Sequence, residues 1–159
     1  PVQLIFLGTG NPEYQEQLTD WAQKYPDRIS YTAAYDEPLA HLIEAGSDLF
    51  LMPSRFEPCG LNQIYSLKYG TPPIVHHTGG LADTVIDSGD RKDNGFAFDQ
   101  YDGETLLATI HRAVEVYRND PAKMQQLVSN AMRADFSWER SAGKYMELYQ
   151  NILNQGGTA

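Results

Sequence analysis

The sequence contains one cysteine, few basic residues and no long apolar run. The single cysteine, Cys59, cannot form an internal disulfide, so we expect a reducing compartment: the cytoplasm or, in a plant or alga, a plastid. There are 12 basic and 21 acidic residues, and the formal net charge of −9 argues against nucleic acid or an anionic membrane as a partner. No apolar run approaches membrane-spanning length. A small anionic ligand stays compatible with this charge, because backbone N–H groups can bind it locally.

The length of 159 residues suits one domain with its own core, and residues 1–159 are predicted to form a single domain. The chain begins without Met and enters an apolar run at Val2, so we expect it to be a piece of a longer protein. The last four residues, from Gly156 to Ala159, are expected to fray.

Strand-like and helix-like segments alternate from Val2 to Phe98. Strands are expected at residues 2–7, 28–33, 48–52, 73–76 and 95–98, and helices at residues 12–25, after Asp36 and at residues 60–69. Three further helices are expected with Asp102, Asp120 and Ser137 as N-caps. This order predicts an α/β fold: a Rossmann-like parallel sheet flanked by helices, with right-handed βαβ units and a helical C-terminal portion.

Unusual residues follow several of the expected strands. Gly8 and Gly10 follow the first, Tyr35 the second, residues 54–62 the third and residues 76–81 the fourth. In open parallel sheets, ligands bind beyond the carboxyl ends of the strands. The alternative is that any loop between a strand and a helix carries turn residues. The first glycine pair lacks the third glycine of a dinucleotide fingerprint and the ending of a P-loop, and such a pair alone is more often a tight turn.

The segment from Ser54 to Val75, SRFEPCGLNQIYSLKYGTPPIV, is the strongest candidate for a site. Gly60 lets another molecule approach the backbone, and the N–H groups of Gly60, Leu61 and Asn62 are expected to be unpaired donors at a helix N-terminus, which suits phosphate. Glu57 just ahead would repel phosphate but would accept hydrogen bonds from sugar hydroxyls. The pair suits a ligand with a phosphate end and a hydroxyl end. The structural alternative is a helix N-terminus capped by its own carboxylate.

Cysteine and histidine chemistry is a weaker interpretation of the same sequence. Cys59 could be a nucleophile, because a helix N-terminus lowers the pKa of a thiol, and His41, His76, His77 and His111 are available as bases. No pairing between cysteine and histidine follows from the sequence, and a lone cysteine is more often inert. The adjacent His76 and His77 point to opposite faces of a strand end, which argues against a metal site.

Two long motifs resemble those of bacterial glycogen synthases and plant starch synthases. Residues 53–61, PSRFEPCGL, resemble the donor-site motif of that family, and residues 78–85, TGGLADTV, resemble its downstream motif. Further matching positions are Gln63, Tyr65, Lys68-Tyr69-Gly70, Pro72, Leu7-Gly8-Thr9-Gly10, Tyr35, Phe96 and Phe136-Ser137-Trp138. The resemblance covers essentially the whole chain in order.

The resemblance implies a retaining GT-B glycosyltransferase with two Rossmann-like domains, of which this chain corresponds to the second, the nucleotide-sugar-binding domain. The implied reaction transfers glucose from ADP-glucose to the 4-OH end of an α-1,4-glucan, without a metal ion or other cofactor. The acceptor-side domain and a first basic motif, whose Arg and Lys contact the diphosphate, would lie outside the chain, so we expect the isolated chain to be inactive. The last helix of the fold crosses back to the first domain, and the segment after Trp138 is therefore expected to be poorly anchored or self-packed.

The resemblance also implies roles for individual residues. Glu57 resembles the active-site carboxylate that holds glucose hydroxyls and stabilises positive charge developing on the sugar. Tyr35 resembles a residue beside the base and ribose of the nucleotide. The other residues implied to line the nucleotide-sugar site are Cys59, Gly60, Leu61 and Asn62 at the diphosphate, Thr78, Gly79 and Gly80 in the downstream motif, and Gly8 and Gly10 after the first strand.

Two other functions stay open at this stage. Many related retaining transferases carry a second Glu eight positions after the first, and here that position is Tyr65, which favours the glycogen and starch synthase branch. The rival enzyme is another retaining GT-B transferase that uses a UDP- or GDP-sugar. The rival without catalysis is a degenerate glucan-binding or scaffold module, in which ancestry alone would preserve Glu57.

Overall fold

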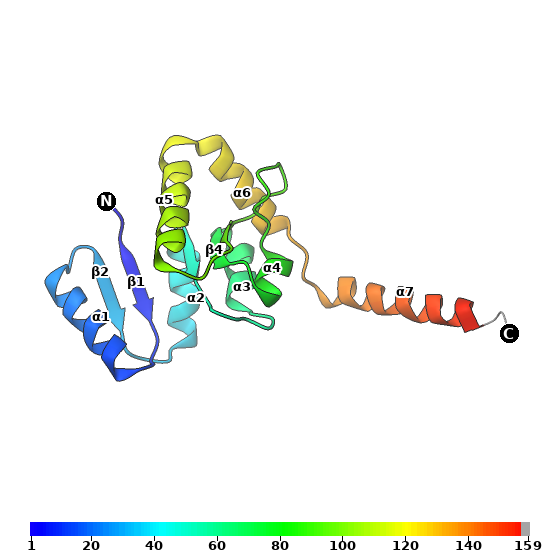
Figure 1. The fold of residues 1–159 in the computed structure, drawn as a ribbon, viewed down its shortest axis with the longest axis horizontal. Helices are drawn as coiled ribbons and strands as arrows, with labels where there is room; N and C mark the ends of the chain where they lie inside the picture. Colours follow the sequence, from blue (N-terminus) through cyan, green and yellow to red (C-terminus); the bar gives the residue numbers. More distant parts are fainter. Residues whose placement is uncertain (157–159) are drawn as a thin grey trace. The chain divides into compact units, whose positions relative to one another are not determined.

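The structure is a computed structural model that describes residues 1–156. The chain divides into two compact units, Pro1–Asp48 and Leu49–Ala159, and each is described by itself (Figure 1). Of the frayed end expected from Gly156 onward, residues 157–159 lie outside the described part, and Gly156 is still helical. No described helix combines the length and the hydropathy needed to cross a membrane.

The first unit is one βαβ unit followed by a helix. Its elements are β1 (Leu4–Leu7), α1 (Pro12–Lys24), β2 (Ile29–Thr32) and α2 (Glu37–Gly46). The two strands pair in parallel, with Leu4 opposite Ile29, and α1 packs against β2. Asn11 caps α1 by accepting the N–H of Glu13 at 2.9 Å, and Pro12 takes the first helical position, where its missing N–H costs nothing.

The second unit holds a three-stranded parallel sheet in the order β3-β4-β5. Its elements are β3 (Phe50–Met52), α3 (Asn62–Tyr69), β4 (Pro73–His76), α4 (Gly79–Thr84), β5 (Phe96–Phe98), α5 (Gly103–Asn119), α6 (Pro121–Arg133) and α7 (Trp138–Gly156). The predicted parallel α/β class is confirmed. The described strands form two sheets, however, and not the single sheet that their alternation suggested.

The core of the second unit lies on both faces of β4. Ile74 is buried with Phe96 and with side chains of α5 and α6, among them Leu127. The next residue along the strand, Val75, is buried in a separate cluster with Leu81 of α4. Successive side chains of a strand point to opposite faces, so helices cover both sides of this sheet, as expected for buried parallel strands.

Local signals in the sequence placed most helix ends correctly. Asp36, Asp102 and Asp120 each accept a backbone N–H from the first turn of the following helix, and Ser137 does so for α7 at 3.3 Å. Gly70 ends α3 with a φ of 78°, in the left-handed conformation that glycine adopts without a steric penalty. The short helix α4 was not predicted, because Gly-Gly at its start is a signal for a turn.

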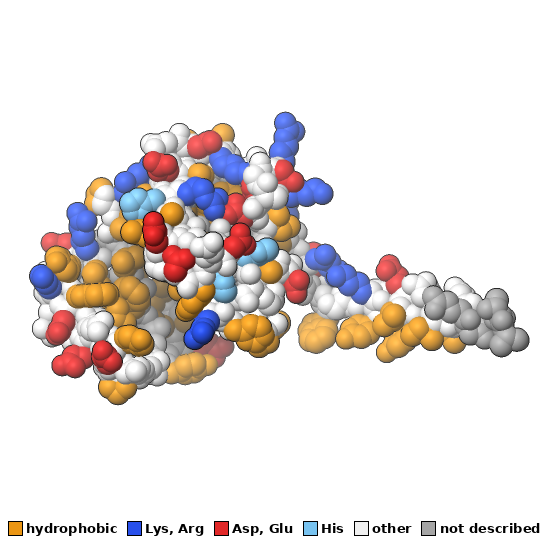
Figure 2. Space-filling view, viewed as in Figure 1, with side chains coloured by type: hydrophobic (Ala, Val, Ile, Leu, Met, Phe, Trp, Pro, Cys, Tyr) orange, Lys and Arg blue, Asp and Glu red, His pale blue; other side chains and the backbone are white. Residues whose placement is uncertain are grey.

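The long helix α7 carries a row of apolar side chains that the described residues leave exposed. Tyr145, Met146, Tyr149, Ile152 and Leu153 are each more than half exposed, and Figure 2 shows apolar side chains gathered along one side of this helix. Positions spaced by three and four residues share one face of a helix. The observation agrees with the expectation that the segment after Trp138 is poorly anchored.

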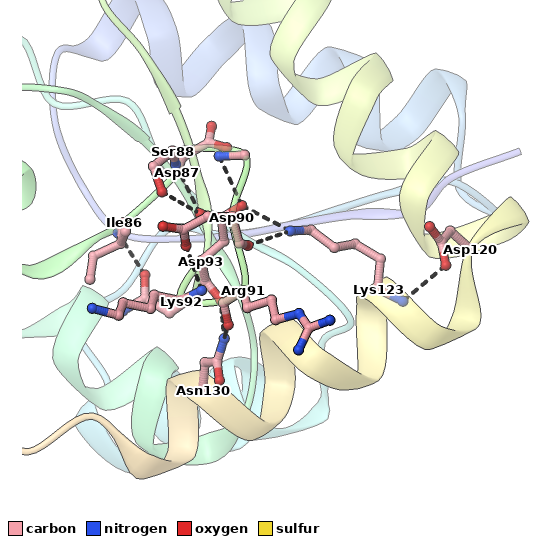
Figure 3. A network of polar contacts seen from close by, with 12 residues as sticks. Ile86, Asp87, Ser88, Asp90, Arg91, Lys92, Asp93, Asp120, Lys123 and Asn130 are labelled. Carbon is pink, nitrogen blue, oxygen red and sulfur yellow. Dashed lines mark hydrogen bonds and ion pairs between the residues drawn. The ribbon is translucent and has the colours of Figure 1, made fainter.

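A polar network fastens the loop between α4 and β5 to α6 (Figure 3). Asp93, which is 2% exposed, accepts from the N–H and hydroxyl of Ser88 and pairs with Lys123 at 2.9 Å. The side chain of Asn130 donates to the carbonyls of Arg91 and Asp93, at 2.8 and 2.7 Å. Burial alone would raise the pKa of Asp93, but the bonds from Lys123 and Ser88 outweigh it and hold the pKa below its ordinary value of 3.8.

Candidate functional site

The turn that follows β3 presents a row of backbone donors. Gly60 has a φ of 75°, and α3 begins at Asn62 with Leu61 as an N-cap that has no side-chain hydrogen bond. Within residues 1–156, the backbone N–H groups from Cys59 to Ile64 have no acceptor. Such a cluster at a helix N-terminus carries partial positive charge and suits an anion.

The helix start differs from the prediction by two residues. The sequence suggested that Gly60 and Leu61 supply first-turn donors, but the first turn begins at Asn62, and Gly60 lies in the preceding turn. The positive φ of Gly60 breaks the helical geometry there, which the sequence pattern did not reveal. The prediction of unpaired N–H groups at residues 60–62 holds.

The carboxylate of Glu57 does not cap the helix. Glu57 is half-buried, and its side chain forms no hydrogen bond or ion pair with any described residue. The structural alternative, in which this carboxylate satisfies the N-terminus of α3, is therefore wrong. Glu57 stands two residues ahead of the N–H donors that begin at Cys59, and its carboxylate has no described partner to displace before it binds a ligand.

Gly79 and Gly80 pack against the backbone of the turn that follows β3. The N–H of Gly80 donates to the carbonyl of Glu57 at 2.9 Å. A Cβ at Gly79 would overlap that same carbonyl oxygen, and a Cβ at Gly80 would overlap the backbone of Cys59. The downstream motif and the donor motif therefore touch, and glycine is required where the two backbones meet.

Gln63 clamps the turn from the inside. Its fully buried amide donates to the carbonyls of Cys59 and Gly60, at 2.9 and 3.1 Å, and to the hydroxyl of Thr84 at 3.3 Å. The same amide lies where a Cβ of Gly60 would be, so it also excludes any larger residue there. Sequence reasoning included Gln63 only as a motif position. The sequence does contain one signal for this role. Gln63 stands three and four residues after Gly60 and Cys59, a spacing at which a helical side chain can reach the preceding turn.

Replacing Gln63 with leucine tests this clamp. The leucine has a similar volume but leaves the carbonyls of Cys59 and Gly60 and the hydroxyl of Thr84 without their donor. We expect a loss of about 2 kcal/mol in the free energy of unfolding, measured by urea denaturation. Gln125→Leu, on the exposed side of α6, is the matched control and is expected to stay within about 0.5 kcal/mol of the wild type.

The histidines and the cysteine near this turn do not form a catalytic pair. Nδ1 of His76 lies 3.0 Å from the carbonyl oxygen of Ser54, and Nδ1 of His77 lies 3.1 Å from Asp99. Cys59 is exposed, and its sulfur is 3.6 Å from the carbonyl oxygen of Gly60. His76 thus anchors the start of the loop, and within the described residues no histidine is bonded to the sulfur of Cys59.

Thr78 precedes α4 as its N-cap residue, without a side-chain hydrogen bond to the helix. Three further candidate residues lie in the first unit. Gly8 has a φ of 150°, and its carbonyl accepts from the hydroxyl of Tyr31 at 3.1 Å. The side chain of Gln15 donates to the carbonyl of Gly10 at 2.9 Å. A Cβ at either glycine would meet nothing within 4 Å, so the outer side of this turn is open. Tyr35 is 91% exposed.

Comparison with known proteins decides the family. Residues 1–133 match the family described as glycosyl transferases group 1. The chain belongs to this family. The match includes β1 to α6, and therefore both glycine turns and the turn after β3.

Relatives of this glycosyl transferase chain include glycogen synthases and a starch synthase. It is 54% identical over 156 residues to the glycogen synthase of Cellvibrio japonicus and 48% identical over 156 residues to that of Thermosipho africanus, covering 96% and 97% of this chain. It spans 32% of the length of each relative. The catalytic domain of Starch Synthase IV from Arabidopsis thaliana, bound to ADP and acarbose, is 39% identical with a TM-score of 0.82, covering 94% of this chain and 32% of that one. The predicted membership of this branch and the GT-B fold class are confirmed.

Proposed function

We propose that this chain is the ADP-glucose-binding domain of a glycogen or starch synthase. Residues 1–159 would act as one nucleotide-sugar-binding domain. The longer protein would be a cytoplasmic glycosyltransferase. The full protein would transfer glucose, with retention, to the 4-OH end of an α-1,4-glucan held by its other domain. The observation that carries the proposal is the row of N–H donors from Cys59 to Ile64 with the carboxylate of Glu57 two residues ahead, none of which has a partner within residues 1–156. Relatives of known name and the ADP in the starch synthase support the choice of ligand.

The donors would bind the diphosphate of ADP-glucose. Cleavage of the bond between glucose and phosphate leaves an additional negative charge on the diphosphate. That charge would be stabilised by the backbone amides of Gly60, Leu61 and Asn62. These amides need no reorganisation, because the contacts of Gly79 and Gly80 hold the turn in place.

Glu57 would act on the sugar. Its acceptor-only carboxylate suits hydrogen bonds from glucose hydroxyls, and its negative charge stabilises the positive charge that develops at the anomeric carbon in glycosyl transfer. Thr78 is proposed to line the same site. For Tyr35 of the first unit, a contact with the base and ribose stays a prediction, as does a nucleotide-sugar contact for Gly8 and Gly10. Cys59 contributes its backbone N–H and not its thiol.

Titration calorimetry of this chain with ADP, UDP and ADP-glucose tests the proposal. We expect saturable binding of ADP in preference to UDP. Glu57→Ala should lower the affinity for ADP-glucose by about tenfold, which corresponds to the loss of one or two hydrogen bonds to a charged group. The affinity for ADP should stay unchanged. Glu115→Ala, an exposed glutamate of α5, is the matched control and should change neither.

The other outcomes separate the rivals. A preference for UDP or GDP would favour a different retaining transferase. Glucan binding without nucleotide binding would favour the scaffold module. If this chain binds no nucleotide while a longer chain that includes the upstream segment does, basic residues outside this chain dominate the affinity.

A further inference from the structure

The segment from Ser54 to Pro58, which carries Glu57, is held by two hydrogen bonds. Nδ1 of His76 donates to the carbonyl oxygen of Ser54 at 3.0 Å, and the N–H of Gly80 donates to the carbonyl oxygen of Glu57 at 2.9 Å. Within the described part of the chain, no other hydrogen bond or ion pair reaches this segment. The position of Glu57 therefore depends on one bond from the backbone and one from a side chain.

The ring of His76 is fixed by its surroundings. His76 is the last residue of β4 and is partly buried. Its ring packs against those of Phe98 and Tyr101, with centroid distances of 5.4 and 5.1 Å, which are ordinary for aromatic contacts. Its own carbonyl accepts from the N–H of Thr78 at 2.8 Å. A side chain whose orientation is locked by packing keeps its hydrogen-bond partner in one place.

The bond to Ser54 assigns the proton of the imidazole ring. A carbonyl oxygen only accepts, so Nδ1 of His76 carries a hydrogen and, in the neutral ring, Nε2 does not. Among the described residues, Nε2 has no hydrogen-bond partner. The contribution of His76 thus depends on the donor at Nδ1, and a substitute must supply a donor at that position.

The phosphate end of the turn has a different support. Gln63 donates to the carbonyls of Cys59 and Gly60, and neither bond involves His76. The N–H donors proposed for the diphosphate begin at Cys59, after the segment that His76 holds. The two ends of the proposed ligand site therefore have separate supports, one from β4 and one from α3.

We propose that His76 is a positioning residue for the sugar end of the site, because its Nδ1 holds the segment that carries Glu57. This inference rests on the proposed function, since it takes Glu57 to contact the sugar. Without the Nδ1 donor, the carbonyl of Ser54 is released and the segment around Glu57 shifts, whereas the donors from Cys59 onward stay clamped by Gln63. The consequence is selective: the affinity for ADP-glucose falls and the affinity for ADP does not.

Three substitutions of His76 separate its ring from its donor. His76→Phe keeps a ring against Phe98 and Tyr101 but has no donor. In His76→Asn the amide nitrogen stands as many bonds from Cα as Nδ1 does, and in His76→Gln it stands as far away as Nε2. We expect the Phe and Gln variants to bind ADP-glucose about tenfold more weakly, and ADP within about twofold of the wild type. His76→Asn should keep the affinity for ADP-glucose within about threefold.

The affinities are measured by titration calorimetry of this chain or, where its affinity is too low, of the longer chain that includes the upstream segment. Urea denaturation verifies that each variant folds. His111→Asn, at an exposed position of α5, is the matched control and should leave both affinities unchanged. Two-bond proton–nitrogen NMR spectra of the wild type should show the imidazole proton of His76 on Nδ1, a readout that requires no nucleotide.

Four results would each overturn this inference alone, beside normal binding by the wild type. They are a proton on Nε2, an unchanged ADP-glucose affinity in His76→Phe, a His76→Asn variant as weak as His76→Phe, and equal losses of ADP and ADP-glucose affinity. The last result would indicate a general structural role. If the wild type binds no nucleotide in either length of chain, the proposed function fails, and this inference fails with it.

Discussion

Replacing Gly80 with alanine is expected to abolish most nucleotide affinity while the chain still folds. The new Cβ would meet the Cα of Cys59 at 2.5 Å and its carbonyl carbon at 2.7 Å, and backbone atoms cannot rotate away as a flexible side chain can. The turn from Glu57 to Gly60 must move, and its N–H donors move with it. We expect at least about a tenfold loss of ADP affinity, since misplaced charge-assisted bonds cost that much each, and a loss of about 1–3 kcal/mol in unfolding free energy.

Gly103→Ala is the matched control for this substitution. Gly103 is the first residue of α5, and a Cβ there would meet nothing within 4 Å. Alanine in that position should leave ADP affinity unchanged and should raise the stability slightly, because it restricts the unfolded chain. Unchanged ADP affinity in Gly80→Ala would contradict the view that the downstream motif holds the donor turn in place.

The second large effect is expected at Asp93. Asp93→Asn removes the buried negative charge that pairs with Lys123, and the remaining amide cannot accept all the bonds that the carboxylate accepts from Ser88 and Gly89. Removing one partner of a buried pair leaves the other charge uncompensated. We expect a loss of about 3 kcal/mol in the free energy of unfolding at neutral pH, measured by urea denaturation. The exposed Asp20→Asn on α1 should change it by less than about 0.5 kcal/mol.

The pH dependence provides an independent test of the same network. The pKa of Asp93 is lower in the folded chain than its ordinary value of 3.8, so the folded state favours the ionised carboxylate. Its contribution is fully present above pH 3.8 and is lost as the pH falls through the lower folded pKa. Asp93→Asn should therefore lose less stability than the wild type between neutral pH and strong acid. If the free energy of unfolding falls equally in both proteins as the pH is lowered, this expectation is contradicted.

Most of the local structure was predictable because its causes lie within a few residues. Three helices are capped by an aspartate that accepts the N–H three residues later: Asp36, Asp102 and Asp120. Gly70 ends α3 through its own left-handed backbone conformation, which depends on no distant residue. The turn after β3 was predicted to bind an anion for the same reason, since unpaired first-turn donors follow from any helix N-terminus.

The errors arose where distant segments meet. The helix at residues 79–84 was missed because Gly79 and Gly80 suggest a turn, whereas they are needed for contact with a turn some twenty residues earlier. The side chain of Gln63 was not singled out, because its partner Thr84 lies on another helix. The alternation of strands and helices along the chain also did not predict that the described strands form two sheets.

Residue types and their order along the chain were sufficient to establish the α/β class, the helix caps and the family, since each depends on short-range geometry or on motif identity. Contacts between distant segments had to come from the folded chain. They place Gly80 against the backbone of Cys59 and leave the carboxylate of Glu57 without a partner among residues 1–156. The physical reason is that capping is decided by a helix's own backbone, whereas close approach and charge pairing depend on which distant segments pack together.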